Sequence, residues 1–254
     1  MRLTFARRAR VVAPLLAGAG ALLLSAAACA QEGGAASGQM SAARGNLPPL
    51  DSVLRRAESS RQHGSQYARV TLFEISDFQC PYCKMFHDST YAKFDSAYVK
   101  TGKVRHVFIH FPLPMHNQAF AASKASMCAG AQGKFWEMQD RLFTRQREWR
   151  DQADATQRFA RYATDLGVEA AQYRDCMEND RVSTLIVNDI MQASGAQVNS
   201  TPTLILNQKI LSGAIPFAQL SQEIEAMLAA PAGTPPAGAP PATRPAAPST
   251  PARP

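Results

Sequence analysis

Cys80 and Cys83 stand three residues apart in the motif C-P-Y-C. The motif follows an apolar run at 70–75, which is typical of a strand, and it precedes a stretch with helical spacing. A cysteine in the first turn of a helix lies among unpaired backbone N–H groups at the positive end of the helix dipole, and both features favour the thiolate. Because only the thiolate attacks a disulfide, this order of elements predicts thiol–disulfide exchange.

The two thiols are expected to have different roles. Pro81 suits the first position of the helix, because its fixed φ is helical and the N–H that it lacks would have no partner there. Cys80 is therefore expected to be the exposed nucleophile. Cys83 lies one turn later on the same face, where it can attack a mixed disulfide at Cys80 and act as the resolving thiol.

A structural zinc site is the main alternative for two cysteines at this spacing, but it needs two more ligands, normally a second CxxC or an HxxxH pair. Cys29, Cys128 and Cys176 stand alone in the sequence, and only His106 and His110 have the HxxxH spacing. That pair falls in a strand-like run, where even spacing is more typical of an exposed or hydrogen-bonded face. We therefore expect no metal, and the lack of a glycine-rich phosphate loop in the sequence predicts no nucleotide cofactor.

The first 28 residues have the pattern of a bacterial secretory signal peptide. Four arginines are followed by an apolar segment at 11–24 and by small residues at 25–28. The apolar segment is interrupted by proline and glycine and is short for a stable membrane span, so we expect it to be removed. The mature protein is therefore predicted in the periplasm or at the outer face of the cell envelope, where disulfides persist.

Two cleavage sites remain open. Residues 26–29 resemble a lipoprotein cleavage box, after which Cys29 would carry the lipid and could anchor the protein to the membrane. Ordinary signal peptidase can instead cut after Ala30, because residues 28–30 satisfy the small-x-small rule. We favour the lipoprotein. In either case residues 29–48, rich in Gly, Ala and Ser, are expected to form a flexible linker.

The formal net charge of +7 comes mostly from segments outside the predicted folded region. The signal peptide and the tail at 231–254 hold six arginines and no acidic residue, which leaves 21 basic against 20 acidic side chains. A nearly neutral domain gives no indication of nucleic-acid binding. The tail is rich in proline and alanine, has little apolar bulk to bury, and is expected to be disordered.

Residues 49–230 are long enough for one domain with a substantial core. Strands are expected at 70–75 and 104–111, with a helix at 84–99 between them, which makes a right-handed parallel unit. An all-helical insertion is expected at about 117–193. The other elements expected from the pattern are a leading helix from residue 50, insertion helices at 119–129, 135–143, 157–166 and 173–191, a hairpin at 203–206 and 210–211, and a closing helix at 216–228.

Three segments together resemble the DsbA-like thiol:disulfide oxidoreductases of the bacterial cell envelope. They are E-I-S-D-F-Q-C-P-Y-C at 74–83, Q-G-K-F-W-E-M-Q-D-R-L-F at 132–143, and S-T-P-T at 200–203 before the hairpin. The resemblance covers nearly the whole folded region. It implies an α/β thioredoxin-like fold with an all-helical insertion, and it implies that the active-site cysteines lie at the junction of the two parts.

The resemblance also assigns roles to individual residues. Thr201 and Pro202 match the loop whose cis-proline faces the CxxC and helps to align the substrate chain. Glu74 matches a buried acid beneath the resolving thiol, where a carboxylate can accept the proton of that thiol; the alternative is an edge carboxylate that is simply solvated. Tyr82 stands where the strongest oxidants of the family have histidine, so the pKa of Cys80 is expected to be depressed within the broad range of about 3.5 to 7.5.

Cys128 and Cys176 both fall in the predicted helical insertion. In an oxidising compartment two otherwise unmatched cysteines in one small subdomain are expected to form a structural disulfide, and two separate buried thiols are the alternative. His116 matches a histidine that is common in the family, but the spacing of the sequence indicates no catalytic partner for it.

The sequence therefore predicts a cell-envelope dithiol oxidase that introduces disulfides into reduced exported proteins. The resemblance implies that a membrane partner of the DsbB or VKOR type reoxidises it. Two alternatives remain: the opposite direction, as a disulfide reductase or isomerase, and a non-catalytic protein that holds copper or another soft metal at the CxxC. No Met- or His-rich stretch accompanies Cys80, which argues against the metal carrier.

Overall fold

The structure is a computed structural model that describes residues 50–230 of the 254. The predicted signal peptide at 1–28, the linker at 29–48 with Cys29, and the tail at 231–254 lie outside the described residues. Among residues 50–230, no helix combines the length and the apolar character that a membrane span requires.

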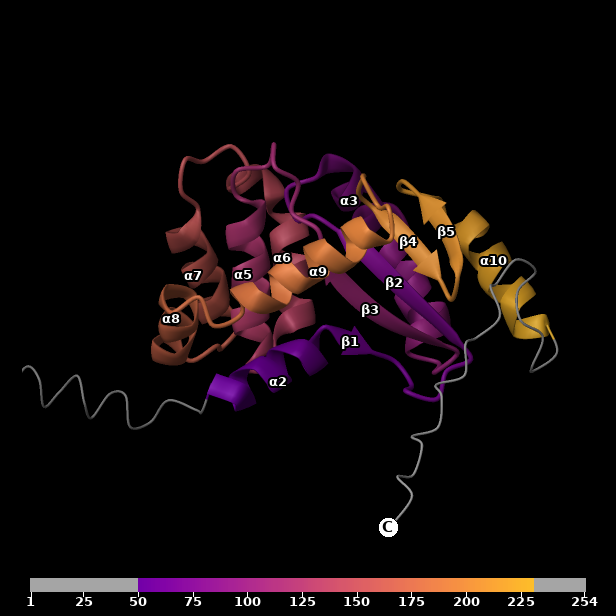
Figure 1. Cartoon of the computed structure of the whole chain (residues 1–254), viewed down its shortest axis with the longest axis horizontal. Coiled ribbons are helices and arrows are strands. Elements are labelled where there is room, and N and C mark those ends of the chain that lie inside the picture. The colour runs from indigo at the N-terminus through magenta and orange to yellow at the C-terminus, as the bar shows by residue number, and fades with distance from the viewer. Residues whose placement is uncertain (1–49, 231–254) are drawn as a thin grey trace, which may run out of the picture. The chain divides into compact units, whose positions relative to one another are not determined.

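Five strands form one mixed sheet in the described part of the chain, in the order β1-β3-β2-β4-β5 (Figure 1). The central strands β2 and β3 are parallel and pair from Val70 opposite Val104 to Ser76 opposite His110. The other pairings are antiparallel. The chain leaves β2 for the CxxC motif, so pairing on both sides of β2 fixes where the motif begins. The strands are β1 (Gln62–His63), β2 (Val70–Ser76), β3 (Val104–His110), β4 (Thr203–Leu206) and β5 (Lys209–Ser212).

The edge strand β1 was not expected, because two residues are too few to show a strand alternation. Gly64 follows it with a φ of +86°, and a Cβ at this position would lie only 2.4 Å from Val104 O. Glycine is therefore required for the chain to turn this close to β3. The turn leaves His63 directly opposite His106 in the antiparallel pair.

One continuous helical run connects β2 to β3. It begins at Pro81, the residue that the sequence indicated for the first helical position, and Cys80 is its N-cap. Its buried side chains, Phe86 and Phe94 among them, pack on the sheet together with α10. This is the strand, helix and strand unit that the pattern predicted. The elements are α3 (Pro81–Phe86), the π-helical turn η1 (His87–Tyr91), α4 (Ala92–Phe94), the π-helical turn η2 (Asp95–Val99) and α10 (Phe217–Ala229).

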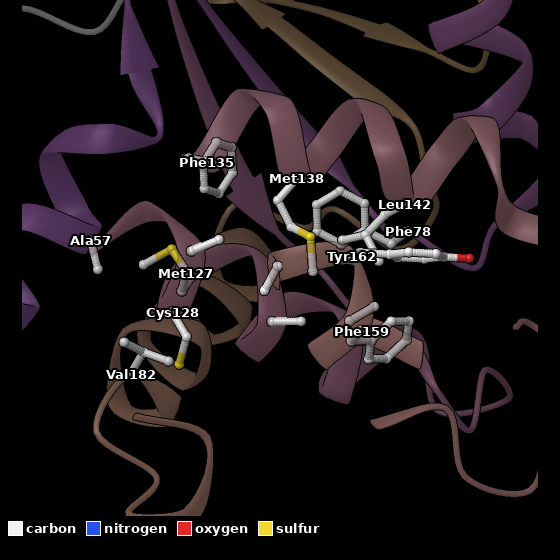
Figure 2. Close-up of a cluster of buried hydrophobic side chains, with 14 of the residues drawn as sticks. Ala57, Phe78, Met127, Cys128, Phe135, Met138, Leu142, Phe159, Tyr162 and Val182 are labelled. Carbon is white, nitrogen blue, oxygen red and sulfur yellow. The ribbon is translucent and has the colours of Figure 1, made fainter. Parts of the chain in front are cut away.

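The helices between β3 and β4 build a separate hydrophobic cluster, which α2 (Leu50–Ser60) also joins. Figure 2 shows Met138, Leu142 and Phe159 of this cluster with Phe78, which lies two residues before Cys80. The Phe78 ring lies 5.0 Å from that of Phe143, so the insertion core anchors the loop that carries the CxxC. The inserted elements are α5 (Ala119–Gly130), α6 (Phe135–Thr144), the 3₁₀ turn η3 (Gln146–Glu148), α7 (Thr156–Asp165), α8 (Ala170–Glu178) and α9 (Ser183–Gly195).

The expectation of a single helix at 173–191 is wrong, because the structure has two helices there, α8 and α9. The backbone of Asp180 between them has a φ of +50°, a left-handed conformation that cannot continue a helix. Aspartate tolerates this conformation better than most residues, and an apolar periodicity that passes through the break hides it from sequence patterns.

Helix α9 packs against the sheet, where Figure 1 shows it crossing in front of β3. Ala193 packs against Ile75. The Asp189 carboxylate lies 2.5 Å from the Arg61 guanidinium and accepts a hydrogen bond of 2.9 Å from the backbone N–H of His110. All three residues are buried, so this ion pair ties α9 to the sheet in one register.

A disulfide joins Cys128 in α5 to Cys176 in α8, with 5.7 Å between the two Cα atoms. Both side chains are buried in the cluster of the insertion. The bond closes a loop of 48 residues within the insertion and lies on different elements from the CxxC.

Candidate active site

Cys80 is the N-cap residue of α3. Its backbone is extended, with φ of −67° and ψ of 127°, and its carbonyl accepts a hydrogen bond of 3.1 Å from Lys84 N, which closes the first helical turn. The side chain is only 4% exposed, although the sequence indicated an exposed nucleophile. The loop at Thr201 covers it, with the Cys80 sulfur 3.4 Å from the Thr201 carbonyl oxygen.

The surroundings of the two thiols, which are in the free dithiol form, separate their acidities. The pKa of Cys80 is lowered from 9.0 to about 6, chiefly by the hydrogen bond from the Cys83 thiol, with further contributions from the Thr201 side chain and from backbone N–H groups of α3. Burial opposes this lowering. The pKa of Cys83 is raised well above 9.0, first by burial and then by Cys80. At neutral pH the pair therefore holds a thiolate at Cys80 and a thiol at Cys83.

The peptide bond between Thr201 and Pro202 is cis, and it lies beside the CxxC. Strand β4, which begins at Thr203, pairs with β2 so that Thr203 lies opposite Ile75. This pairing carries the loop before β4 to the end of β2, where the cysteines begin. The structure thus brings together Cys80 and Thr201, which belong to the two segments that the sequence indicated and are 121 residues apart in the chain.

Gln146 holds the active-site loop from the insertion, and sequence analysis did not find it. Its Nε2 donates to the carbonyl oxygens of Phe78 at 2.8 Å and Cys80 at 3.1 Å, and its side chain is buried. Gln79 adds a second tie, because its Nε2 donates to Arg150 O at 2.7 Å. No sequence signal distinguishes Gln146 from the other glutamines of the insertion.

Asp77 organises the turn between β2 and α3. Its Oδ1 accepts from Gln79 N at 2.7 Å, and its Oδ2 accepts from Leu113 N at 2.8 Å and lies 2.7 Å from His116 Nδ1. Its own N–H points at the Cys83 sulfur, 3.4 Å away. His116, for which spacing indicated no partner, therefore contacts the residue that positions the resolving thiol.

Glu74 is 1% exposed on β2, and its carboxylate lies 3.0 Å from His106 Nε2. The structure shows no hydrogen bond between Glu74 and Cys83 within the described residues; the side chain that faces Cys83 is Ser76, two residues later on the same face of β2. The histidines of the HxxxH pair are both buried, His106 against Glu74 and His110 among aromatic rings. No group of three or more potential metal ligands occurs among residues 50–230.

The family model for thioredoxin matches residues 56–226, more than half of the chain. The chain belongs to the thioredoxin family. Solved structures share its fold at low sequence identity. Alpha-DsbA1 of Wolbachia pipientis is 20% identical with a TM-score of 0.61, and the match covers 73% of this chain and 94% of that protein. Oxidised BdbD of Bacillus subtilis is 18% identical with a TM-score of 0.58, over 72% of this chain and 96% of BdbD.

These matches confirm the predicted thioredoxin-like fold with a helical insertion, as in the DsbA-type proteins. The thioredoxin-family chain also resembles part of some longer proteins. A protein named Na(+)/H(+) antiporter NhaA 1, from Mycolicibacterium gilvum, is 34% identical over 184 residues, which are 68% of this chain and 28% of the antiporter. An NhaA 3 antiporter of Salinispora tropica is 32% identical over 175 residues, or 26% of its length. The chain thus spans about a quarter of the length of these curated relatives.

Proposed function

We propose that the protein is a cell-envelope thiol:disulfide oxidoreductase that oxidises dithiols of exported proteins at Cys80 and Cys83. The observation that most supports this proposal is the low pKa of Cys80, about 6, beside a buried Cys83 whose pKa is raised. A stabilised thiolate at Cys80 favours the reduced form of the pair, and a pair that is stable when reduced is a strong oxidant when oxidised.

The reaction has two exchanges. A client thiolate attacks Cys80 in the oxidised pair, the bond between Cys80 and Cys83 breaks, and Cys83 leaves as a thiolate that takes up a proton. A second client thiolate then attacks the client sulfur of the mixed disulfide, and Cys80 leaves as a thiolate. The client has lost two electrons and the CxxC has gained them.

Other groups at the site have supporting roles in this proposal. The cis-proline loop at Thr201 and Pro202 aligns the extended client chain beside Cys80, and Glu74 exchanges a proton with Cys83. Clients are unfolded or reduced exported proteins, and a membrane partner of the DsbB or VKOR type restores the disulfide. Residues 1–28 direct export, and Cys29 carries a lipid anchor.

The direction is tested by the equilibrium reduction potential of the pair against glutathione. We expect a value of about −120 to −180 mV, and Cys80→Ser abolishes exchange. A potential near about −270 mV would reverse the proposal and make the protein a reductase that is supplied with electrons from the membrane.

A further inference from the structure

The side chains of Glu74, His106 and His63 form a row of polar contacts, of which the exchange chemistry above uses only Glu74. The Glu74 carboxylate lies 3.0 Å from His106 Nε2, and His106 Nδ1 lies 3.2 Å from His63 Nε2. The three residues come from three neighbouring strands, β2, β3 and β1. The row therefore runs across the sheet from the central strand β2, which leads into the CxxC, to the β1 edge.

The inner part of this row is sealed from water and the outer end is open. Glu74 and His106 have exposed fractions of 1% and 0%, and the His106 ring meets Phe94 edge to face at 5.4 Å and Trp136 at 4.9 Å. The His63 side chain stacks on Trp136 with 3.9 Å between ring centroids, and 26% of the side chain is exposed to solvent. A proton at the outer ring can exchange with solvent, whereas one at Glu74 cannot do so directly.

The inner end reaches toward the resolving thiol through Ser76. Residues two apart on a strand lie on one face about 6.5–7 Å apart, so Glu74 and Ser76 share the face that Cys83 covers. The buried Ser76 hydroxyl faces the Cys83 thiol and lowers the pKa of that thiol by a hydrogen bond. A hydroxyl both donates and accepts, so it can pass a proton between the Cys83 thiol and a carboxylate on the same face.

We propose that His106 and His63 relay protons between solvent and Glu74 while Cys80 and Cys83 exchange disulfides. This inference rests on the proposed function of the pair. The exchange chemistry requires such a route, because Cys83 is completely buried and a client that is bound at Cys80 covers the remaining 4% exposure of that residue. The proton that Cys83 gains on reduction and loses on oxidation then has a route that the client does not block.

The row supports this transfer without leaving a net charge on either ring. With Glu74 ionised, His106 donates from Nε2 to the carboxylate and accepts at Nδ1 from His63 Nε2. With Glu74 protonated, each shared hydrogen lies one position further in, toward Glu74: Glu74 donates to His106, His106 donates from Nδ1 to His63 Nε2, and His63 carries the added proton on Nδ1. The two states differ by one proton, which enters or leaves at His63 Nδ1.

The groups around His63 suit its role as the solvent-side end of the proton relay. Its Nδ1 lies 3.8 Å from the Asp95 carboxylate, which Lys100 also contacts at 2.7 Å. The pKa of His63 is lowered to about 4, chiefly by burial and next by His106, so the ring is neutral near pH 7. Substituting His63 therefore removes a proton carrier without changing the charge near the cysteines.

The test compares His63→Ala and His63→Gln in the full chain by stopped-flow reduction of the oxidised pair with dithiothreitol. Both variants are expected to react about a hundredfold more slowly than the unmodified protein, which is the lower end of general acid–base effects, with an unchanged equilibrium potential. Added imidazole is expected to restore the rate of His63→Ala, where it can occupy the space beside Trp136, and not that of His63→Gln.

His87→Gln is the matched control, because His87 is a nearly buried histidine on the run after the CxxC that stacks on Tyr91 and contacts neither end of the row. Its rate is expected to stay unchanged. The relay is refuted if the His63 variants are reduced at the rate of the unmodified protein. It is also refuted if His63→Ala is reduced slowly and imidazole does not restore its rate. If His63→Ala does not fold, a normal rate in His63→Gln overturns it in the same way.

This experiment distinguishes a failure of the proton relay from a failure of the proposed oxidase function. Dithiothreitol reports exchange at the pair whatever its clients are. A protein that depends on His63 in this assay but does not oxidise reduced proteins refutes the oxidase role alone. A protein that oxidises clients but is indifferent to His63 refutes the relay alone.

Discussion

Cys80 and Cys83 are three residues apart, yet their surroundings favour opposite protonation states. Cys80 sits at the N-cap, where backbone N–H groups and the Cys83 thiol stabilise negative charge. Cys83 lies one helical turn later, where burial disfavours its thiolate form. The hydrogen bond between them reinforces the difference, because the group that donates it holds its proton more firmly while the group that accepts it is more easily ionised.

Titration of the thiolate absorbance of the reduced protein is expected to show a transition near pH 6. Cys80→Ser should remove this transition. Cys83→Ala should move it to higher pH, because it deletes the hydrogen bond that is the largest cause of the low pKa of Cys80. A transition near pH 6 that survives in Cys80→Ser would contradict the assignment.

The reduced protein is expected to gain stability relative to the oxidised protein as the pH rises from about 6 to 9. The pKa of Cys80 is about 6 when folded and 9.0 in its ordinary state, so within this window the unfolded chain binds a proton that the folded chain does not. The contribution is complete above 9.0 and is lost as the pH falls through 6. Urea unfolding of both redox forms measures it, with the oxidised form, whose pair does not titrate, as the reference; a constant difference would count against the pKa shift.

At the scale of elements, the active-site turn is held from both parts of the fold. The active-site turn follows strand β2, and the loop before β4 covers Cys80. From the short turn η3 of the insertion, the Gln146 side chain donates hydrogen bonds to the carbonyl groups of Phe78 and Cys80. Phe78 adds apolar contact with α6. The N-cap geometry of Cys80 therefore depends on the insertion as well as on its own helix.

Gln146→Glu is expected to lower the free energy of unfolding by about 2–4 kcal/mol, because it leaves two buried carbonyl groups without a donor. The new carboxylate also lies beside Cys80 and should raise the pKa of that thiol. Urea unfolding and thiolate titration measure the two effects. Gln152→Glu, the same change at an exposed position, is the control and should alter stability by less than about 0.5 kcal/mol. Equal effects of the two substitutions would refute the role of Gln146.

At the scale of the whole molecule, the helical insertion has its own covalent link, and its core extends to Phe78, Cys80 and Cys83. Its helices pack around one apolar cluster, and the disulfide of Cys128 and Cys176 joins α5 to α8 within it. This disulfide is on different elements from the CxxC. Its contribution is thus expected to be structural rather than chemical.

The double variant Cys128→Ala with Cys176→Ala is expected to lose about 4 kcal/mol of unfolding free energy, from the entropy of closing a loop of 48 residues. Its Cys80–Cys83 potential should stay that of the unmodified protein. Urea unfolding and the glutathione equilibrium measure these two quantities. Intact mass after thiol blocking of the unreduced, denatured protein checks the bond itself: blocking of both cysteines would disprove the pairing.

Much of the fold was predictable because its signals are local. An apolar run, a CxxC and a helix-compatible stretch follow one another directly at 70–99, and glycines and prolines mark the ends of several other elements. Strand β1 and the break between α8 and α9 were missed. Two residues are too few for a pattern, and the left-handed Asp180 interrupts a periodicity that continues on both sides.

The sequence by itself determined the chemistry at Cys80 and Cys83, because a helix start acts on residues within one turn of it. Only the tertiary structure decided what surrounds them. Gln146 reaches Cys80 from 66 residues away, His116 reaches Asp77 from 39, and His63 reaches His106 from 43. Such contacts arise from the pairing of distant strands and from the docking of the insertion on the sheet, and neither leaves a periodic signal in the residues that it brings together.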